Sequence, residues 1–252
     1  MKIAVAGGTG LVGSLVVRAA QEQGHQVVVL ARSRGTDLVN GTGSAGAEPL
    51  TDALAGVETV IDVANTSVVS AKASTRFFST VTANLLAAEQ ATGVRHHLAL
   101  SIVGVDRAPI GYYAGKRAQE QRVEAGSVPW TIIRATQFHE FVAQVYAAAK
   151  VGPLHLAPKM RTQPVAAREV AERLVGLASE RPAGFVADFG GPREESLVEM
   201  LRAYARARGS KAWIPAVPLP GGFGRAQRDG RLLPGPHAQR GVQTFAEWLA
   251  DL

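Results

Sequence analysis

Hydrophobic and polar positions follow two alternating periodicities along the first 150 residues. Short apolar runs, of the length of a buried strand, are separated by stretches whose apolar residues recur three and four positions apart, as on an amphipathic helix. The runs predicted as strands are Lys2–Ala6, Gln26–Leu30, Val57–Val63, His96–Leu100 and Val128–Ile133. The stretches predicted as helices are Leu11–Gln23, Thr75–Thr92 and Tyr113–Ala125. This alternation predicts an α/β fold with a mostly parallel, doubly wound sheet.

The pattern loosens after about residue 150. The elements predicted there are helices at 168–178, 194–208 and 244–252, a short strand at 185–189 and an irregular, proline-rich connection at 211–236. We therefore expect a larger part at 1–150 and a smaller C-terminal part at 151–252.

Composition narrows the class of protein. The chain has 252 residues, of which 46% are hydrophobic and 19% charged, a mixture typical of a folded globular protein. It has no cysteine, which excludes a disulfide framework, a thiol nucleophile and a zinc–thiolate site. The N-terminal residues lack the apolar core of a signal peptide, and no stretch of about 18 apolar residues occurs. We expect a cytoplasmic protein with no membrane partner.

The net charge of +6 comes mainly from one segment of the chain. Residues 202–240 hold eight basic residues and one acidic residue, Asp229. Prolines and glycines interrupt this segment, and aromatic residues are not interleaved with the basic ones, so a solvated surface is favoured over a nucleic-acid site. We expect a small-molecule substrate as the partner and no nucleic acid. A homodimer is compatible with the sequence.

A glycine-rich loop lies between the first predicted strand and the first predicted helix. Gly7, Gly10 and Gly13 have the spacing G-x-x-G-x-x-G. In a dinucleotide-binding loop the first glycine permits a sharp turn, the second lets a pyrophosphate approach the backbone, and the third lets helix and strand pack closely. Free N–H groups at the helix N-terminus then face the phosphates. The candidate cofactor-binding residues are Gly7, Thr9, Gly10, Leu11, Val12 and Gly13.

The end of the second predicted strand indicates which dinucleotide binds. NAD-binding proteins place an acidic residue there for the ribose 2′-hydroxyl. This chain has Arg32 and Arg34 instead, and its nearest carboxylate is Asp37. Because a guanidinium pairs well with a 2′-phosphate, the sequence predicts NADP(H) as cofactor, with Arg32 and Arg34 as candidate ligands. The alternative is that one or both are solvated loop residues.

Ser101, Tyr112 and Lys116 form the candidate catalytic set. Ser101 follows a predicted strand, at the sheet edge where open α/β sheets bind ligands. Tyr112 and Lys116 are four residues apart, which places them on one helix face. An ammonium near a phenol lowers the pKa of the phenol, so Tyr112 could donate a proton to a carbonyl that Ser101 orients. Alternatively, Tyr112 only packs on the ribose, Lys116 only binds its hydroxyls, or Tyr113 takes the role of Tyr112.

Taken together, the glycine loop, Arg32, Ser101 and the Tyr-x-x-x-Lys motif resemble the short-chain dehydrogenase/reductase superfamily. The segment 134–141, Arg-Ala-Thr-Gln-Phe-His-Glu-Phe, resembles more narrowly its atypical, NmrA-like NAD(P)H-binding branch. The resemblance implies a Rossmann-type sheet in the order 3-2-1-4-5-6, an NAD(P)-binding domain at 1–150 and a substrate-binding region at 151–252. It also implies cofactor contacts by Asn65 and Thr136, and substrate contacts by Phe138 and His139.

Three functions are compatible with these motifs. The first is an NADPH-dependent oxidoreductase that reduces a carbonyl or quinone-like small molecule, with Tyr112 as proton donor. The second is an NmrA-like redox sensor that binds NADP(H) without catalysis and acts through a protein partner. The third, an epimerase or lyase, is disfavoured because about 100 C-terminal residues leave little room for a sugar-nucleotide domain. No metal site is expected, because adjacent strand residues such as His96 and His97 point to opposite faces.

Overall fold

The computed structural model describes residues 1–43, 49–152 and 154–252. The chain forms two compact units that interleave in sequence. Unit 1 consists of 1–101, 111–134 and 168–186, and unit 2 consists of 102–110, 135–167 and 187–252. The boundary near residue 150 that the sequence indicates falls inside unit 2.

Unit 1 is built on a twisted sheet in the order β2-β1-β3-β4-β5, with β10 beside β5. The pairs β1–β2, β1–β3, β3–β4 and β5–β10 are all parallel. The strands are β1 (Lys2–Ala6), β2 (Gln26–Leu30), β3 (Thr59–Asp62), β4 (His96–Ile102), β5 (Trp130–Ala135) and β10 (Gly184–Phe185). The predicted α/β fold with a parallel Rossmann-type sheet is confirmed.

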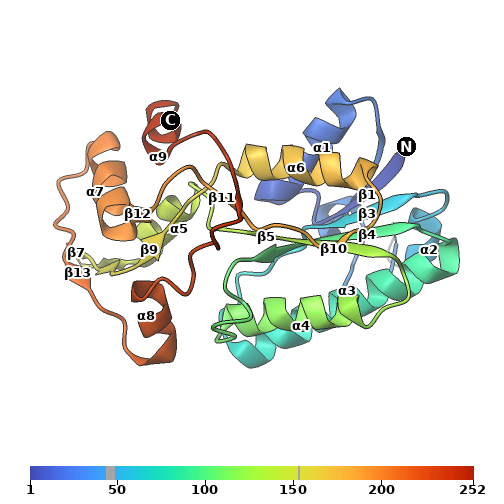
Figure 1. Ribbon diagram of the computed structural model, residues 1–252, viewed down its shortest axis with the longest axis horizontal. Helices are drawn as coiled ribbons and strands as arrows, with labels where there is room; N and C mark the ends of the chain where they lie inside the picture. The colour runs from blue at the N-terminus through green and yellow to red at the C-terminus, as the bar shows by residue number, and fades with distance from the viewer. Residues whose placement is uncertain (44–48, 153) are drawn as a thin grey trace. The chain divides into compact units, whose positions relative to one another are not determined.

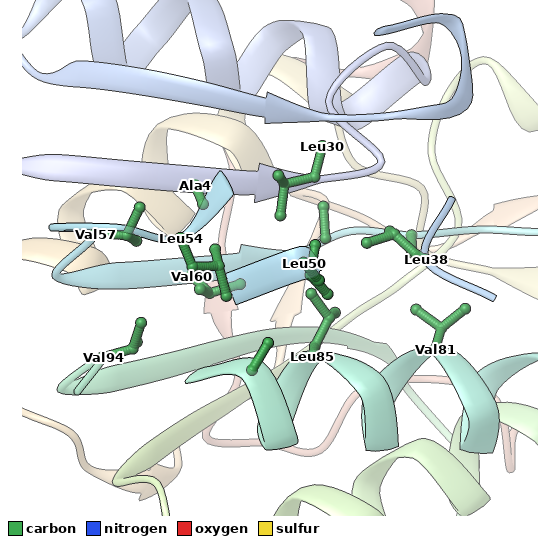
Figure 2. Close-up of a cluster of buried hydrophobic side chains, with 13 residues drawn as sticks. Ala4, Leu30, Leu38, Leu50, Leu54, Val57, Val60, Val81, Leu85 and Val94 are labelled. Carbon is green, nitrogen blue, oxygen red and sulfur yellow. The ribbon is translucent and has the colours of Figure 1, made fainter. Parts of the chain in front are cut away.

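Helices cover both faces of this sheet (Figure 1). One face carries α1 (Leu11–Glu22) and α6 (Ala167–Ser179), and the other carries α3 (Ala71–Thr92) and α4 (Tyr112–Glu124). A cluster of buried side chains fills the space between the sheet, the short helix α2 (Leu50–Ala53) and α3 (Figure 2). Its centre includes Val60, Leu54 and Leu85, each less than 1% exposed. The helices are therefore held by apolar burial on their sheet-facing sides.

The strand order departs from the one that the resemblance implied. A third strand would lie outside β2, but among the described residues none does. After β2 the chain forms a short 3-10 helix, η1 (Arg32–Arg34), and two isolated bridges, Asp37 to Thr42 and Thr42 to Pro49. Of this segment, the described residues 40–43, Asn-Gly-Thr-Gly, include two glycines and lack the alternation of a half-buried strand, which fits their isolated bridges.

Unit 2 contains short strand pairs and four helices within its described residues. The helices are α5 (Phe141–Ala148), α7 (Leu197–Ala207), α8 (Gly221–Arg228) and α9 (Phe245–Ala250). The strand pairs are β6 (Lys150–Val151) with β7 (Leu154–His155), β8 (Ala157–Pro158) with β13 (Ala216–Val217), β9 (Arg161–Thr162) with β12 (Glu195–Ser196), and β11 (Phe189–Gly190) with β14 (Gln239–Arg240).

Two sequence predictions need correction here. The strand predicted at 185–189 is two short strands, β10 and β11, separated by three residues. The connection predicted as irregular at 211–236 contains β13 and α8. Helix α8 escaped the sequence reasoning because two glycines begin it and its buried residues, which include Gly224 and Gln227, are not strongly apolar.

Candidate functional site

The glycine loop turns the chain sharply from β1 into α1. Gly7 has a φ of +81°, which favours glycine, and a Cβ there would lie 2.8 Å from the Ala64 Cα. A Cβ on Gly13 would lie 2.1 Å from the Gly7 carbonyl oxygen. Gly7 and Gly13 are therefore needed for the turn itself and for the close packing of α1, as the sequence predicted for the first and third glycines.

Gly10 has a different environment. It is the N-cap of α1, has an extended backbone, and no side chain caps the helix there. A Cβ on Gly10 would meet one atom, the Gly7 carbonyl oxygen at 3.3 Å. Thr9, Gly10 and Leu11 are exposed, whereas Val12 packs into the core. An uncapped helix N-terminus with an exposed glycine fits a pyrophosphate, because first-turn N–H groups favour negative charge.

Arg32 and Arg34 lie in η1, directly after β2. Both side chains are exposed, and neither makes a hydrogen bond or ion pair with another described residue. Ser33, between them, donates to Thr9 Oγ1 at 3.4 Å and so connects this turn to the glycine loop. The two guanidinium groups are thus available to an anionic ligand beside the loop.

The phenol of Tyr112 is anchored to the segment that follows β3. Tyr112 begins α4, one residue earlier than the sequence predicted, and its hydroxyl donates to Asn65 Oδ1 at 2.8 Å. Asn65 follows Ala64, the residue against which Gly7 packs. The phenol therefore lies at the carboxyl edge of the sheet, near the glycine loop.

Lys116 is buried, and its ammonium is held by groups of unit 1. It donates to the Leu100 carbonyl oxygen at 2.6 Å and to Gln119 Oε1, and it lies 4.6 Å from the centre of the Phe78 ring. The same ring contacts Tyr112 edge to face at 5.5 Å. Lys116 and Tyr112 thus share a neighbour, but no hydrogen bond joins them among the described residues.

The pKa values of the two groups shift in ways that the spacing alone did not predict. Burial raises the pKa of Tyr112 above its ordinary value of 10. Burial lowers the pKa of Lys116 to about 8, against the opposing charges of Asp62 and Glu120. The expectation that the ammonium lowers the pKa of the phenol is therefore wrong, because Lys116 donates to Leu100 and Gln119 and burial alone shifts Tyr112.

Ser101 lies near the end of β4 and has a buried hydroxyl. Its Oγ has no hydrogen-bond partner among the described residues. A buried polar atom without a partner costs free energy, so its presence at a ligand-binding edge of the sheet is consistent with a partner supplied by a bound molecule.

The remaining predicted site residues belong to unit 2. The Thr136 hydroxyl donates to the Gln163 carbonyl oxygen at 2.6 Å, and Phe138 is half-buried. His139 is completely buried, with Nε2 3.1 Å from the Gln243 carbonyl oxygen and its ring against Phe245 and Trp248 of α9. These contacts lie within the unit, and the cofactor and substrate roles of Thr136, Phe138 and His139 stay predictions.

Sequence reasoning missed Asp62, Gln119 and Phe78. Asp62 ends β3 and accepts from Gln119 Nε2 at 2.7 Å, and Gln119 in turn accepts from Lys116. The available signals were a lone acid at the end of an apolar strand and a glutamine three residues after Lys116, on the same helix face.

Two negative findings concern the described residues only. They include no group of three or more His, Cys, Asp or Glu side chains placed to hold a metal ion. None of their helices has both the length and the apolar character that crossing a lipid bilayer requires.

Comparison with known protein families decides the class of the chain. Residues 7–181 match the model of a family described as NAD(P)H-binding. The chain belongs to this NAD(P)H-binding family. The match includes the glycine loop, Tyr112 and Lys116, and it confirms the nicotinamide dinucleotide cofactor and the resemblance inferred from the sequence.

Individual relatives of this NAD(P)H-binding protein are more distant. It is 27% identical over 237 residues to the photosystem II assembly factor Ycf39 of Synechocystis sp., a match that covers 87% of this chain and 71% of the relative. Among solved structures, it is similar to an NADPH complex of a quinone oxidoreductase from Escherichia coli, with a TM-score of 0.70, 16% identity and 99% of each chain covered.

A UDP-glucose 4-epimerase from Stenotrophomonas maltophila, with bound NAD, is also similar in structure. The TM-score is 0.71 at 16% identity, and the match covers 100% of this chain and 96% of the epimerase. These similarities show a shared fold. They also overturn the size argument against an epimerase, because an epimerase chain is matched over nearly its whole length.

Proposed function

We propose that this NAD(P)H-binding protein is an NADPH-dependent reductase of a small carbonyl or quinone-like molecule. The cofactor supplies the hydride, and the protein supplies orientation and a proton. Tyr112 donates the proton, Ser101 orients the substrate oxygen, and Lys116 serves the phenol and the ribose. Asn65 and the glycine loop contribute to holding the cofactor.

The observation that carries the proposal is the hydrogen bond from Tyr112 to Asn65. It brings a proton-bearing phenol to the carboxyl edge of the sheet, next to the segment on which Gly7 packs. A phenol with an ordinary pKa of 10 is protonated at neutral pH, as a proton donor must be, and the raised pKa of Tyr112 does not change this. The alkoxide that forms when a ketone accepts hydride is basic enough to take this proton, so the phenol need not be ionised beforehand.

Two arginines directly after β2 support the choice of NADPH over NADH, because NADPH carries a 2′-phosphate that a guanidinium can pair with. Arg32 and Arg34 are the cationic side chains of η1, and both are free of partners among the described residues. NADPH oxidation measured against a panel of quinones, ketones and enones tests the proposal. We expect turnover of at least one of these substrate classes. If ketones are reduced, the Tyr112→Phe variant should lose that activity.

A second candidate is a redox sensor that binds NADP(H) without catalysis and acts through a protein partner. One observation favours it: the Lys116 ammonium is engaged by Leu100 and Gln119 and not by Tyr112. If the protein turns over none of these substrates, while NADPH and NADP change its affinity for a protein partner, the sensor replaces the reductase.

A further inference from the structure

The ammonium of Lys116 is one end of a buried chain of hydrogen bonds. Gln119 Oε1 accepts from Lys116 Nζ, and Gln119 Nε2 donates to Asp62 Oδ2 at 2.7 Å. We propose that Gln119, oriented by Asp62, is a positioning residue that sets the place and the protonation of the Lys116 ammonium. This inference rests on the proposed function only for what the ammonium does during the reaction.

Asp62 determines which way the amide of Gln119 faces. A carboxylate accepts hydrogen bonds but donates none, so the amide NH₂ group must face Asp62. The amide oxygen is then left to face Lys116, and an ammonium, which only donates, needs that oxygen. All three side chains are buried, so water does not substitute for a misplaced partner.

Asp62 is itself held in place. Its other oxygen, Oδ1, accepts from the Ala64 backbone N–H at 3.0 Å. Ala64 is the residue whose Cα lies against Gly7. The chain of bonds therefore extends from the segment beneath the glycine loop, through Asp62 and Gln119, to Lys116.

The groups that face the Lys116 ammonium come from four elements. They are Asp62 of β3, acting through Gln119, the Leu100 carbonyl of β4, the Phe78 ring of α3 and Glu120 of α4 itself. Burial lowers the pKa of Lys116 to about 8, and the negative charges of Asp62 and Glu120 oppose that effect.

The two acids are not equivalent. Glu120 is occupied by a two-point ion pair with Arg134, at 2.8 and 2.9 Å, and by Arg117 at 2.9 Å. Among the described residues, no cationic side chain is bonded to Asp62. Its partners are Gln119 and the Ala64 backbone N–H, and its charge also acts on His97. We therefore expect loss of the Asp62 charge to lower the pKa of Lys116 more than loss of the Glu120 charge would.

Three variants test the chain. Asp62→Asn removes the charge and the constraint on the amide, and Gln119→Met removes the acceptor with little change in volume while leaving Asp62 intact. The double variant Asp62→Asn with Gln119→Glu reverses the arrangement: an Asn amide faces a Glu carboxylate, which then accepts from Lys116.

The readout is the titration of Lys116 in the full, ligand-free chain, followed by NMR of isotope-labelled lysine, with the signal identified by its loss in Lys116→Met. Each single variant is expected to lower the pKa of Lys116 by about one pH unit, because a stabilising partner of the charged form is lost. The double variant is expected to restore the wild-type value or exceed it. Gln121→Met, two residues along α4, is the matched control and should leave the titration unchanged.

The proposal would be overturned if Lys116 kept its wild-type pKa in both natively folded single variants. It would also be overturned if the pKa of Lys116 did not recover in a natively folded double variant. Where turnover is found, the alkaline limb of the pH–rate profile should move in the same direction as the Lys116 titration. A protein that shows the titration shifts but reduces no substrate supports the positioning role and overturns the proposed reductase.

Discussion

Residues with the same name have different roles at this site. Gly7 and Gly13 are required by the fold, since a side chain on either would collide with the backbone, whereas a Cβ on Gly10 would meet only the Gly7 carbonyl oxygen, at 3.3 Å. Tyr112 donates to Asn65 at the sheet edge, while its neighbour Tyr113 is buried. The difference in each case lies in what surrounds the residue.

At the residue scale, we predict that Arg32 determines the preference for NADPH over NADH. Wild-type protein should bind NADPH at least tenfold more tightly than NADH, since a charge-assisted bond to the 2′-phosphate contributes roughly 1.5–3 kcal/mol. Arg32→Asp should erase or reverse the preference, measured as the ratio of the two dissociation constants. Arg18→Asp, on α1, is a control for charge alone. Equal wild-type affinities would contradict the assignment of Arg32.

We also predict that the Tyr112 hydroxyl donates the proton when a ketone is reduced. Tyr112→Phe keeps the ring against Phe78 but removes the hydroxyl, so kcat on a ketone should fall by about 10²–10⁴-fold, with NADPH affinity little changed. Tyr113→Phe is the matched control and should retain the wild-type rate. Full activity of Tyr112→Phe would show that the phenol is not the acid, and a quinone, which can take its proton from water, would then be favoured as substrate.

At the scale of elements, β4 contacts β5 and α3 through two adjacent histidines whose pKa values shift in opposite directions. His96 Nε2 lies 2.9 Å from Thr131 Oγ1 of β5, and burial, with a smaller contribution from His97, lowers its pKa to about 4. His97 Nδ1 lies 2.8 Å from Glu89 of α3. Burial alone would lower the pKa of His97, but Glu89 and Asp62 raise it above its ordinary value.

The His97–Glu89 pair predicts a pH-dependent contribution to stability. Because the folded-state pKa of His97 is raised, the stabilisation is fully present below the unfolded pKa of about 6.5 and is lost as the pH rises through the folded pKa. Glu89→Gln should lower the free energy of unfolding by roughly 1.5–3 kcal/mol at pH 6, the usual worth of a hydrogen bond to a charged group. The difference from wild type should shrink above the folded pKa.

Urea unfolding between pH 5.5 and 9 measures this effect. Glu172→Gln is the control, because Glu172 is an exposed residue of α6 with a 3.9 Å contact to Arg168, a type of pair that contributes little. A Glu89→Gln variant whose difference from wild type does not change with pH would show that His97 stays neutral in the folded protein.

At the scale of the whole molecule, ligand binding is linked to global stability. NADPH at one hundred times its dissociation constant should raise the free energy of unfolding by about 2.7 kcal/mol, seen as a higher melting temperature. Gly10→Val should abolish this shift and keep the native circular dichroism, because only the Gly7 carbonyl oxygen, at 3.3 Å, lies near the new Cβ.

Gly13→Ala provides the contrast to this prediction. Its Cβ would lie 2.1 Å from the Gly7 carbonyl oxygen, so the variant should melt at a lower temperature even without ligand. An unchanged NADPH-induced shift in Gly10→Val would mean that the glycine loop is a turn with no role in binding.

Much of unit 1 could be read from the sequence by itself. The strands, the covering helices and the glycine loop follow from local periodicity and from backbone conformations that only glycine adopts readily, both of which short segments encode. The family membership agrees with that reading. The pairs of residues that face each other at the site could not be read in the same way.

The tertiary structure alone decided those pairs. Tyr112 meets Asn65 across 47 positions of sequence, and Gln119 meets Asp62 across 57. Such contacts depend on the register of neighbouring strands and on how closely α4 approaches α3, where Gly115 lies against Ser74. The interleaving of the two units also depends on long-range packing. Residues 102–110 follow a segment of unit 1 but belong to unit 2, and residues 168–186 follow a segment of unit 2 but belong to unit 1. Local patterns determine which elements form, whereas the apolar burial that brings distant elements together determines which side chains meet.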